Sequence, residues 1–128
     1  MKEKMIRTLM VEPNKHPCIK VLENNLDSLQ KAVSIGAEYQ GYIEAVHLKD
    51  GVMLLCNEEA KLLKLQGNRM VNGDLIAGIF YLVSTDEEGN FASLTTEEIK
   101  EYAQEFWYPE YYTAKDVEDA IFVSFEFH

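Results

Sequence analysis

The sequence predicts an α+β fold, in which a mostly antiparallel sheet of about five to seven strands is covered on one side by two or three helices. Short β-branched and apolar runs recur along the chain, and tight turns join some of them directly. The helical patterns do not alternate strictly with single strands, which argues against a parallel α/β sheet. With 128 residues, 47% of them hydrophobic, the chain is predicted to form a single domain over residues 1–128.

The first elements predicted are a hairpin and a helix. Residues 6–11 and 18–22 are both apolar and β-branched, and they are expected to pair as antiparallel strands. Asn24 or Asn25 then caps a helix, because an Asn side chain accepts a hydrogen bond from the first-turn amides. Apolar positions recur at helical spacing until Gly36, namely Leu26, Leu29, Ala32 and Val33.

A second hairpin is predicted from residues 41–48 and 52–56. Asp50-Gly51 lies between these two apolar runs, and glycine tolerates the positive φ that such a turn requires. Residues 57–63 are then expected to form a short helix, whose acidic first turn suits the helix dipole.

The second half is predicted to contain a strand, a helix and a closing strand. Residues 75–83 form a long apolar strand, with Gly78 allowing a bulge or a close approach. Thr95 and Glu98 have the spacing of a capping box, which begins a helix. Residues 120–127 alternate as a strand, with one face formed by Ile121, Val123, Phe125 and Phe127.

The net charge of −10 is concentrated in the last third of the chain. Residues 1–85 carry ten acidic and ten basic side chains, whereas residues 86–128 carry twelve acids against Lys100 and Lys115. This excess opposes direct binding to nucleic-acid phosphates. It indicates either a surface for a basic protein partner or a solvated face that maintains solubility.

Cysteine use and hydropathy predict a cytoplasmic protein. Cys18 and Cys56 lack C-x-x-C spacing and are expected to be reduced thiols. The first residues do not have the pattern of a signal peptide, and the longest apolar stretch, residues 75–83, is shorter than the ~20 residues that cross a bilayer. No membrane association is expected.

The motifs of common enzyme and cofactor sites are missing. His16, His47 and His128 are too scattered to predict a metal site. The sequence contains no phosphate-binding loop with lysine, no dinucleotide fingerprint and no nucleophile elbow. We therefore expect no cofactor and no catalytic residues, and rank an enzyme of unknown reaction as the third functional alternative.

One polar constellation predicts a ligand site at a corner of the sheet. In the second hairpin Glu44 lies across from Cys56 and Asn57, and Glu58, Asn68 and Arg69 follow in the sequence. Arg69 and helix amides would bind an anion, whereas the two glutamates would bind a cation or hydroxyl groups. The alternative is a structural network in which Asn57 caps a helix and Glu44 pairs with Arg69.

An acidic and aromatic run supplies candidate residues for binding a protein partner. Glu97, Glu101 and Glu105 recur at four-residue spacing on the predicted helix, and Trp107 and Tyr108 follow. Aromatic side chains with a polar atom are common at interfaces. Packing of the aromatic residues on the core is the alternative interpretation.

Six short motifs follow one another along the chain: Val11-Glu12-Pro13, Gly41-Tyr42-Ile43-Glu44, Cys56-Asn57-Glu58-Glu59-Ala60-Lys61, Asn68-Arg69, Ile76-Ala77-Gly78-Ile79-Phe80 and Leu94-Thr95-Thr96-Glu97-Glu98. Their order resembles that of the DUF3846 family, small proteins of bacterial plasmids, conjugative elements and phages. The resemblance spans residues 6–106 and leaves residues 107–128 as an extension. The resemblance implies a mobile genetic element as gene neighbourhood and implies no reaction.

Together these observations predict a non-catalytic accessory protein of a mobile genetic element. Its acidic C-terminal surface would bind a partner with a basic surface, and mimicry of DNA, as in antirestriction proteins, is the most specific form of this prediction. The alternative is a small-molecule or nucleotide-binding protein that uses the Glu44, Asn57 and Arg69 corner.

Overall fold

The computed structural model describes the backbone of residues 2–126 and the side chains of residues 2–121. Eight strands and three helices lie within these residues, which makes the fold α+β, as predicted. In chain order they are β1 (Met5–Val11), β2 (Cys18–Glu23), α1 (Leu26–Val33), β3 (Ile43–His47), β4 (Met53–Asn57), β5 (Gly67–Val71), β6 (Asp74–Ala77), β7 (Phe80–Thr85), β8 (Phe91–Ala92), α2 (Thr96–Glu105) and α3 (Ala114–Glu126).

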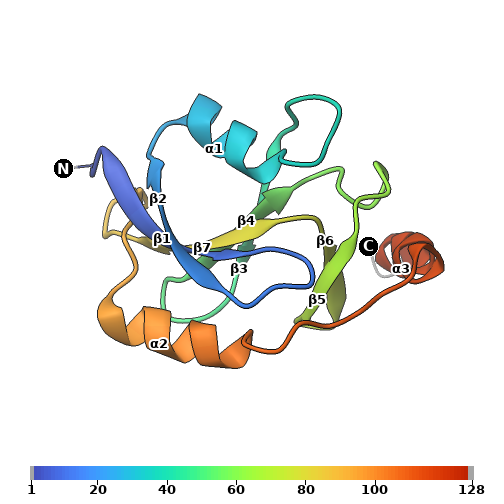
Figure 1. Ribbon diagram of the computed structural model, residues 1–128. Helices are drawn as coiled ribbons and strands as arrows, with labels where there is room; N and C mark the ends of the chain where they lie inside the picture. The colour runs from blue at the N-terminus through green and yellow to red at the C-terminus, as the bar shows by residue number, and fades with distance from the viewer. Residues whose placement is uncertain (1, 127–128) are drawn as a thin grey trace.

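The main sheet is antiparallel, with strand order β2-β1-β7-β4-β3 and the short strand β8 beside β7 (Figure 1). Both predicted hairpins are confirmed, as β1 pairs with β2 and β3 pairs with β4. Asp50 and Gly51 both have positive φ, 51° and 79°, as a two-residue hairpin turn requires. The register places Glu44 directly opposite Cys56.

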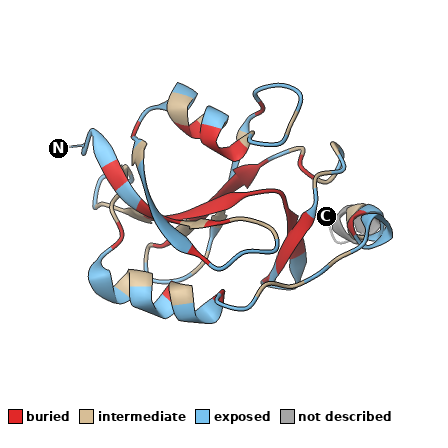
Figure 2. Ribbon diagram, in the orientation of Figure 1, coloured by how far each residue is buried: buried red, intermediate tan, exposed pale blue. Residues whose placement is uncertain are grey.

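Helices lie on both faces of this sheet, so the prediction of helices on one face is wrong. Figure 2 shows that the central strands are buried, with α1 on one side of the sheet and α2 on the other. Adjacent residues of β4 explain this arrangement. Leu55 packs in the hydrophobic cluster that includes residues of α1, whereas Leu54 packs in the cluster that includes residues of α2. Both faces of the central strands are apolar, and each therefore needs its own cover.

The caps of the first two helices are confirmed. Asn25 caps α1 by accepting a hydrogen bond from the amide of Ser28 at 2.8 Å. At α2 the Thr95 hydroxyl accepts from the Glu98 amide at 3.1 Å, and the Glu98 carboxylate accepts from the Thr95 amide at 2.8 Å. This reciprocal pair is the predicted capping box.

The predicted strand over residues 75–83 is two strands in different sheets. Gly78 breaks it with φ of 74°, so that β6 pairs with β5 in a separate two-stranded sheet while β7 enters the main sheet. Asn72 and Gly73 form the β5–β6 turn, again with positive φ at both residues. This hairpin packs on the α2 face of the main sheet through Val71 and Ile76.

The short helix predicted over residues 57–63 does not form. Asn57 ends β4, and its side-chain oxygen accepts a hydrogen bond from the Glu59 amide at 2.8 Å, which directs the chain into turns. Lys64, with φ of 59°, then reverses the backbone before β5. The hydrogen bond of the Asn57 side chain therefore stabilises a turn at the residues where a helix was predicted.

The strand predicted over residues 120–127 is wrong, because the backbone through Glu126 is helical in α3. Thr113 and Asp116 exchange side-chain-to-amide hydrogen bonds of 2.7 and 3.1 Å at the start of this helix. Val117 packs against the β5–β6 hairpin, which fixes the helix there. The predicted alternation at Val123 and Phe125 falls outside the described side chains, and Phe127 lies outside the described residues.

Candidate functional site

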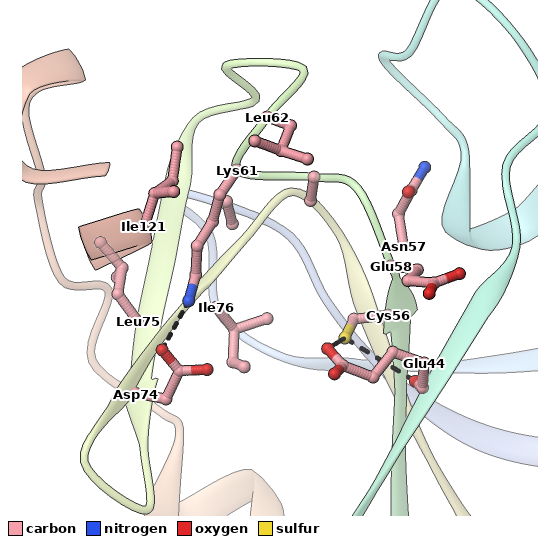
Figure 3. Close-up of a pocket in the computed structure, with 12 residues that line it drawn as sticks. Glu44, Cys56, Asn57, Glu58, Lys61, Leu62, Asp74, Leu75, Ile76 and Ile121 are labelled. Atoms are coloured by element: carbon pink, nitrogen blue, oxygen red, sulfur yellow. Dashed lines mark hydrogen bonds and ion pairs between the residues drawn. The ribbon is translucent and has the colours of Figure 1, made fainter. Parts of the chain in front are cut away.

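A cavity of about 220 Å³ lies between the β3–β4 hairpin and the β5–β6 hairpin (Figure 3). We call it the inter-hairpin cavity. One wall comes from β3, β4 and the turns that follow, and carries Glu44, Cys56 and Glu58. The opposite wall comes from Lys61, from β6 and from α3, and includes Asp74, Leu75, Ile76 and Ile121.

The β3–β4 wall carries a carboxylate beside a buried thiol. Glu44 and Cys56 face each other across the two strands, so their side chains lie on the same side of the sheet. The Cys56 sulfur lies 3.7 Å from both the carboxylate and the carbonyl oxygen of Glu44. Burial, with help from the Glu44 charge, raises the pKa of Cys56 to about 12. The thiol therefore stays protonated near neutral pH and lacks the thiolate that a nucleophile needs.

The opposite wall combines a paired lysine with apolar surface. Lys61 lies 2.5 Å from a carboxylate oxygen of Asp74, and this ion pair crosses the left side of the view in Figure 3. Leu75, Ile76 and Ala77 are all buried and form the apolar part of this wall. An organic group that entered the cavity would therefore meet carboxylates on one side and hydrocarbon on the other.

The structure brings Glu44, Asn57 and Glu58 to the lining of this cavity. The side chain of Asn57 nevertheless belongs to the other face of the sheet, since adjacent residues of a strand alternate. Its amide lies against Gly41, where an added Cβ would come within 3.0 Å of Nδ2. Glu44 and Asn57 therefore do not point toward a common ligand.

Asn68 and Arg69 lie away from the cavity, in a buried hydrogen-bond network. Asn68 donates to the carbonyls of Val11 and Gly78, both at 2.9 Å. Arg69 donates to the carbonyl of Phe106 at 2.8 Å and to the side-chain oxygen of Asn68 at 2.7 Å. Phe106 is the C-cap of α2, where a cation is favourable. The predicted corner of Glu44, Asn57 and Arg69 is thus not assembled. The structural alternative does not form as predicted either, because turns rather than a helix follow Asn57 and Arg69 binds backbone carbonyls and Asn68 rather than Glu44.

Cys56, Lys61, Asp74 and Ile76 belong to the cavity and were not predicted as site residues. Asp74 and Ile76 lie on β6, which we predicted to be continuous with β7 in one strand over residues 75–83. The Asn72-Gly73 turn was the available signal, since it has the same chemistry as the predicted Asp50-Gly51 turn.

The predicted partner-binding residues are all exposed, and we call them the acidic–aromatic surface: Glu97, Glu101, Glu105, Trp107 and Tyr108. The three glutamates lie along one side of α2, and Glu101 forms an exposed ion pair of 2.9 Å with Lys49. Trp107 is 43% exposed and stacks on His16, whereas Tyr108 is 79% exposed. The core therefore does not enclose these two aromatic side chains.

Two further classes of site are absent from the residues that the structure describes. No three His, Cys, Asp or Glu side chains gather there in an arrangement suited to a metal ion. None of the helices in this part of the chain has both the length and the apolar character needed to cross a bilayer.

Comparison with known proteins assigns the family. No curated protein and no solved structure matches the chain. The model of a domain of unknown function, DUF3846, matches residues 6–107, which is most of the 128-residue chain. Within the described residues this match covers the strands from the second residue of β1 onward and the first two helices, and it ends before α3. The chain therefore belongs to the DUF3846 family.

Proposed function

We propose that this protein is a non-catalytic interaction module of a mobile genetic element, which acts in the cytoplasm by binding a protein with a basic surface. The exposure of the acidic–aromatic surface is the observation that carries the proposal. Three carboxylates at four-residue spacing along α2 are followed directly by two exposed aromatic side chains. Charge of one sign accelerates the encounter with a basic partner, and aromatic side chains supply buried contact area.

The most specific form of the proposal is mimicry of DNA. Residues four apart on a helix are separated by about 6 Å along its axis, so the three carboxylates form a regular row of negative charge. A partner that normally binds phosphates would accept such a row. Binding of the partner to DNA and binding to this chain would then exclude each other.

The test compares two variants with equal changes in charge. The first replaces Glu97, Glu101 and Glu105 with Gln, and leaves the capping residue Glu98 unchanged. The second replaces Glu23, Asp27 and Glu38 with Gln, Asn and Gln, on the side of the molecule that carries α1. Each triple change breaks one exposed ion pair, Glu101 with Lys49 or Asp27 with Lys31. Glu23 and Asp27 also accept hydrogen bonds at the start of α1, so thermal midpoints of both variants verify that each is folded before association rates are compared.

A partner is captured from a cell lysate with the tagged chain, purified, and its association rate constant is measured at several salt concentrations. We expect the α2 variant to associate at least about tenfold more slowly at low salt, and the α1-side variant to behave like the wild type. DNA should compete if the mimicry is correct. Equal association rates for all three proteins would show that the charge serves solubility alone.

Binding of a small molecule at the inter-hairpin cavity is the second candidate function. The cavity itself favours it, because carboxylates and apolar side chains face each other across an open space. A nucleotide is no longer the expected ligand, since Arg69 binds backbone carbonyls elsewhere and Lys61 pairs with Asp74. Anionic phosphates would meet Glu44 and Glu58 instead of a cation.

A further inference from the structure

The inter-hairpin cavity has an excess of negative charge on one wall. Among the side chains that the structure describes, neither Glu44 nor Glu58 forms an ion pair with a lysine or an arginine. Lys61 is the basic side chain that lines the cavity. It lies 2.5 Å from Asp74, and both residues belong to the wall opposite Glu44 and Glu58. In Figure 3 the Glu44 carboxylate points into the cavity beside Cys56, whereas the Glu58 carboxylate lies at the edge of the cavity and points away from Lys61 and Asp74.

The rest of the lining is apolar and holds a neutral thiol. Leu75, Ile76 and Ala77 are buried, and Ile121 of α3 completes this side. The Cys56 thiol lies at the base of the acidic wall, 3.7 Å from Glu44. A hydrocarbon group that binds here moves from water onto an apolar surface, which is favourable. The cavity therefore favours a ligand whose main part is apolar over a polar ligand.

The size of the cavity restricts the ligand. An apolar cavity of about 150 Å³ is enough to bind benzene, so a volume of 220 Å³ accommodates a compact ligand. It is below the range of about 300–1,000 Å³ that is typical of drug-sized ligands. A ligand of about six to ten non-hydrogen atoms fits, with its charged group at the acidic wall and its body on the apolar wall.

We propose that the inter-hairpin cavity binds a small aliphatic amine, with its ammonium group beside Glu44 and its hydrocarbon body against Leu75 and Ile76, while Glu58 adds negative charge at the edge of the cavity. A compact alkylammonium ion matches the two walls in charge, in polarity and in volume. This site is independent of the acidic–aromatic surface on α2, so either proposal can fail without the other. The same alkylammonium chemistry also occurs in the lysine side chain of a protein, and the test separates this source from a free amine.

The test uses three ligands of one shape and different charge: cyclohexylamine, cyclohexanol and cyclohexanecarboxylate. Binding is followed by titration of backbone amide NMR signals. We expect saturable shifts at Glu44, Cys56 and Ile76 with cyclohexylamine, binding at least about fivefold weaker with cyclohexanol, and no saturable shift at these residues with the carboxylate. Added salt should weaken binding of the amine, because both glutamates are exposed.

Variants localise the effect to the acidic wall. Changing both Glu44→Gln and Glu58→Gln should weaken cyclohexylamine binding at least about fivefold, whereas Glu59→Gln should leave it unchanged. Glu59 is adjacent in sequence but does not line the cavity, and its carboxylate accepts a hydrogen bond from Tyr39. All three positions are at or near the surface, and unchanged thermal midpoints would verify that the variants fold.

The free amine is distinguished from a protein lysine by comparing n-butylamine with the pentapeptide Gly-Gly-Lys-Gly-Gly, which carries the same alkylammonium group. We expect the peptide to bind no more tightly than butylamine. Tenfold tighter binding of the peptide would overturn the assignment of a free amine and identify a lysine side chain as the ligand. Equal affinity for cyclohexylamine, cyclohexanol and the carboxylate, or an unchanged affinity in the double glutamine variant, would overturn the site itself.

Discussion

Replacement of Arg69 by Met should destabilise the protein strongly, because one buried guanidinium joins three parts of the fold. Its Nη2 donates to the carbonyl of Phe106 at the end of α2 and to the carbonyl of Lys15 in the β1–β2 turn, both at 2.8 Å. Its Nη1 donates to Asn68 beside it on β5 at 2.7 Å. Burial lowers the pKa of Arg69 from its ordinary value, but the side chain stays charged at neutral pH.

The magnitude follows from the acceptors that the substitution leaves behind. Met keeps the apolar stem and removes every donor, so the Phe106 carbonyl and the Asn68 side-chain oxygen lose these hydrogen bonds in a buried environment. An unsatisfied buried acceptor costs about 1–3 kcal/mol, whereas the Lys15 carbonyl is partly exposed and can bind water. Burial of the guanidinium charge is itself unfavourable, so its removal by the substitution offsets part of this loss of stability. We expect the free energy of unfolding to fall by about 2–4 kcal/mol.

Urea denaturation measures this change. A loss of about 3 kcal/mol lowers the midpoint by about 1.5 M when the slope is about 2 kcal/mol/M. Lys31→Met is the matched control, because it also removes a cation but breaks only an exposed pair with Asp27, worth about 0–1 kcal/mol. If Arg69→Met shifted the midpoint no more than this control, the network would contribute nothing to stability and the reasoning would be refuted.

Four further predictions concern individual residues. Gly67→Ala should cost about 1–3 kcal/mol in urea denaturation, because its Cβ would lie 2.7 Å from the Cβ of Tyr112; a wild-type midpoint would contradict this. Thr95→Ala should lose about 1 kcal/mol with the capping box, and an unchanged thermal midpoint would count against it. In the native protein at pH 8 a thiol reagent should modify exposed Cys18 and spare Cys56; two fast-reacting thiols would contradict the burial of Cys56. Because burial raises the pKa of Cys56 from the ordinary 9.0 to about 12, the stability contributed by the neutral thiol is complete below pH 9 and is lost as pH rises toward 12. Tyr81 and Tyr112, whose pKa values are also raised to about 12, titrate in wild type and variant alike, so urea denaturation should show a smaller alkaline loss of stability in Cys56→Ala; an equal loss would contradict this.

The parts of the fold that were predicted correctly depend on local chemistry. Asp50-Gly51 forms its turn because both residues adopt positive φ, and Thr95 with Glu98 forms a capping box within four residues. The hairpin register then follows, which is why the pairing of Glu44 with Cys56 was also predicted. Each of these features is complete within a short segment, so the sequence contains all the partners.

The parts that were missed depend on partners distant in the chain. Asn68 and Arg69 were predicted to line a ligand corner, yet both are fully buried in β5, where carbonyls of Val11, Gly78 and Phe106 accept their hydrogen bonds. Polar residues at those positions give no strand pattern, and their acceptors lie up to 57 residues away. The displacement of Arg69 from the predicted ligand corner has the same cause.

The extension after the family match is part of the same packing unit as the β5–β6 hairpin. The match ends at residue 107, but Val117 of α3 packs in one cluster with Leu75 and Ala77 of β6. The packing of Tyr112 against Gly67 ties the linker before α3 to β5. Without residues 108–126, this side of the hairpin would expose apolar surface, so the extension covers a face that the matched region leaves open.

This arrangement bears directly on the inter-hairpin cavity. Glu44 and Ile76 lie within the region that matches the family, whereas Ile121, on the same cavity, lies in the extension. The charged wall is thus set by the family region, and part of the apolar wall is set by α3. A change confined to α3 would therefore alter the shape and polarity of the cavity while leaving Glu44 and Glu58 in place. Selectivity among amines of different bulk should follow the extension, and the requirement for a positive charge should follow the family region.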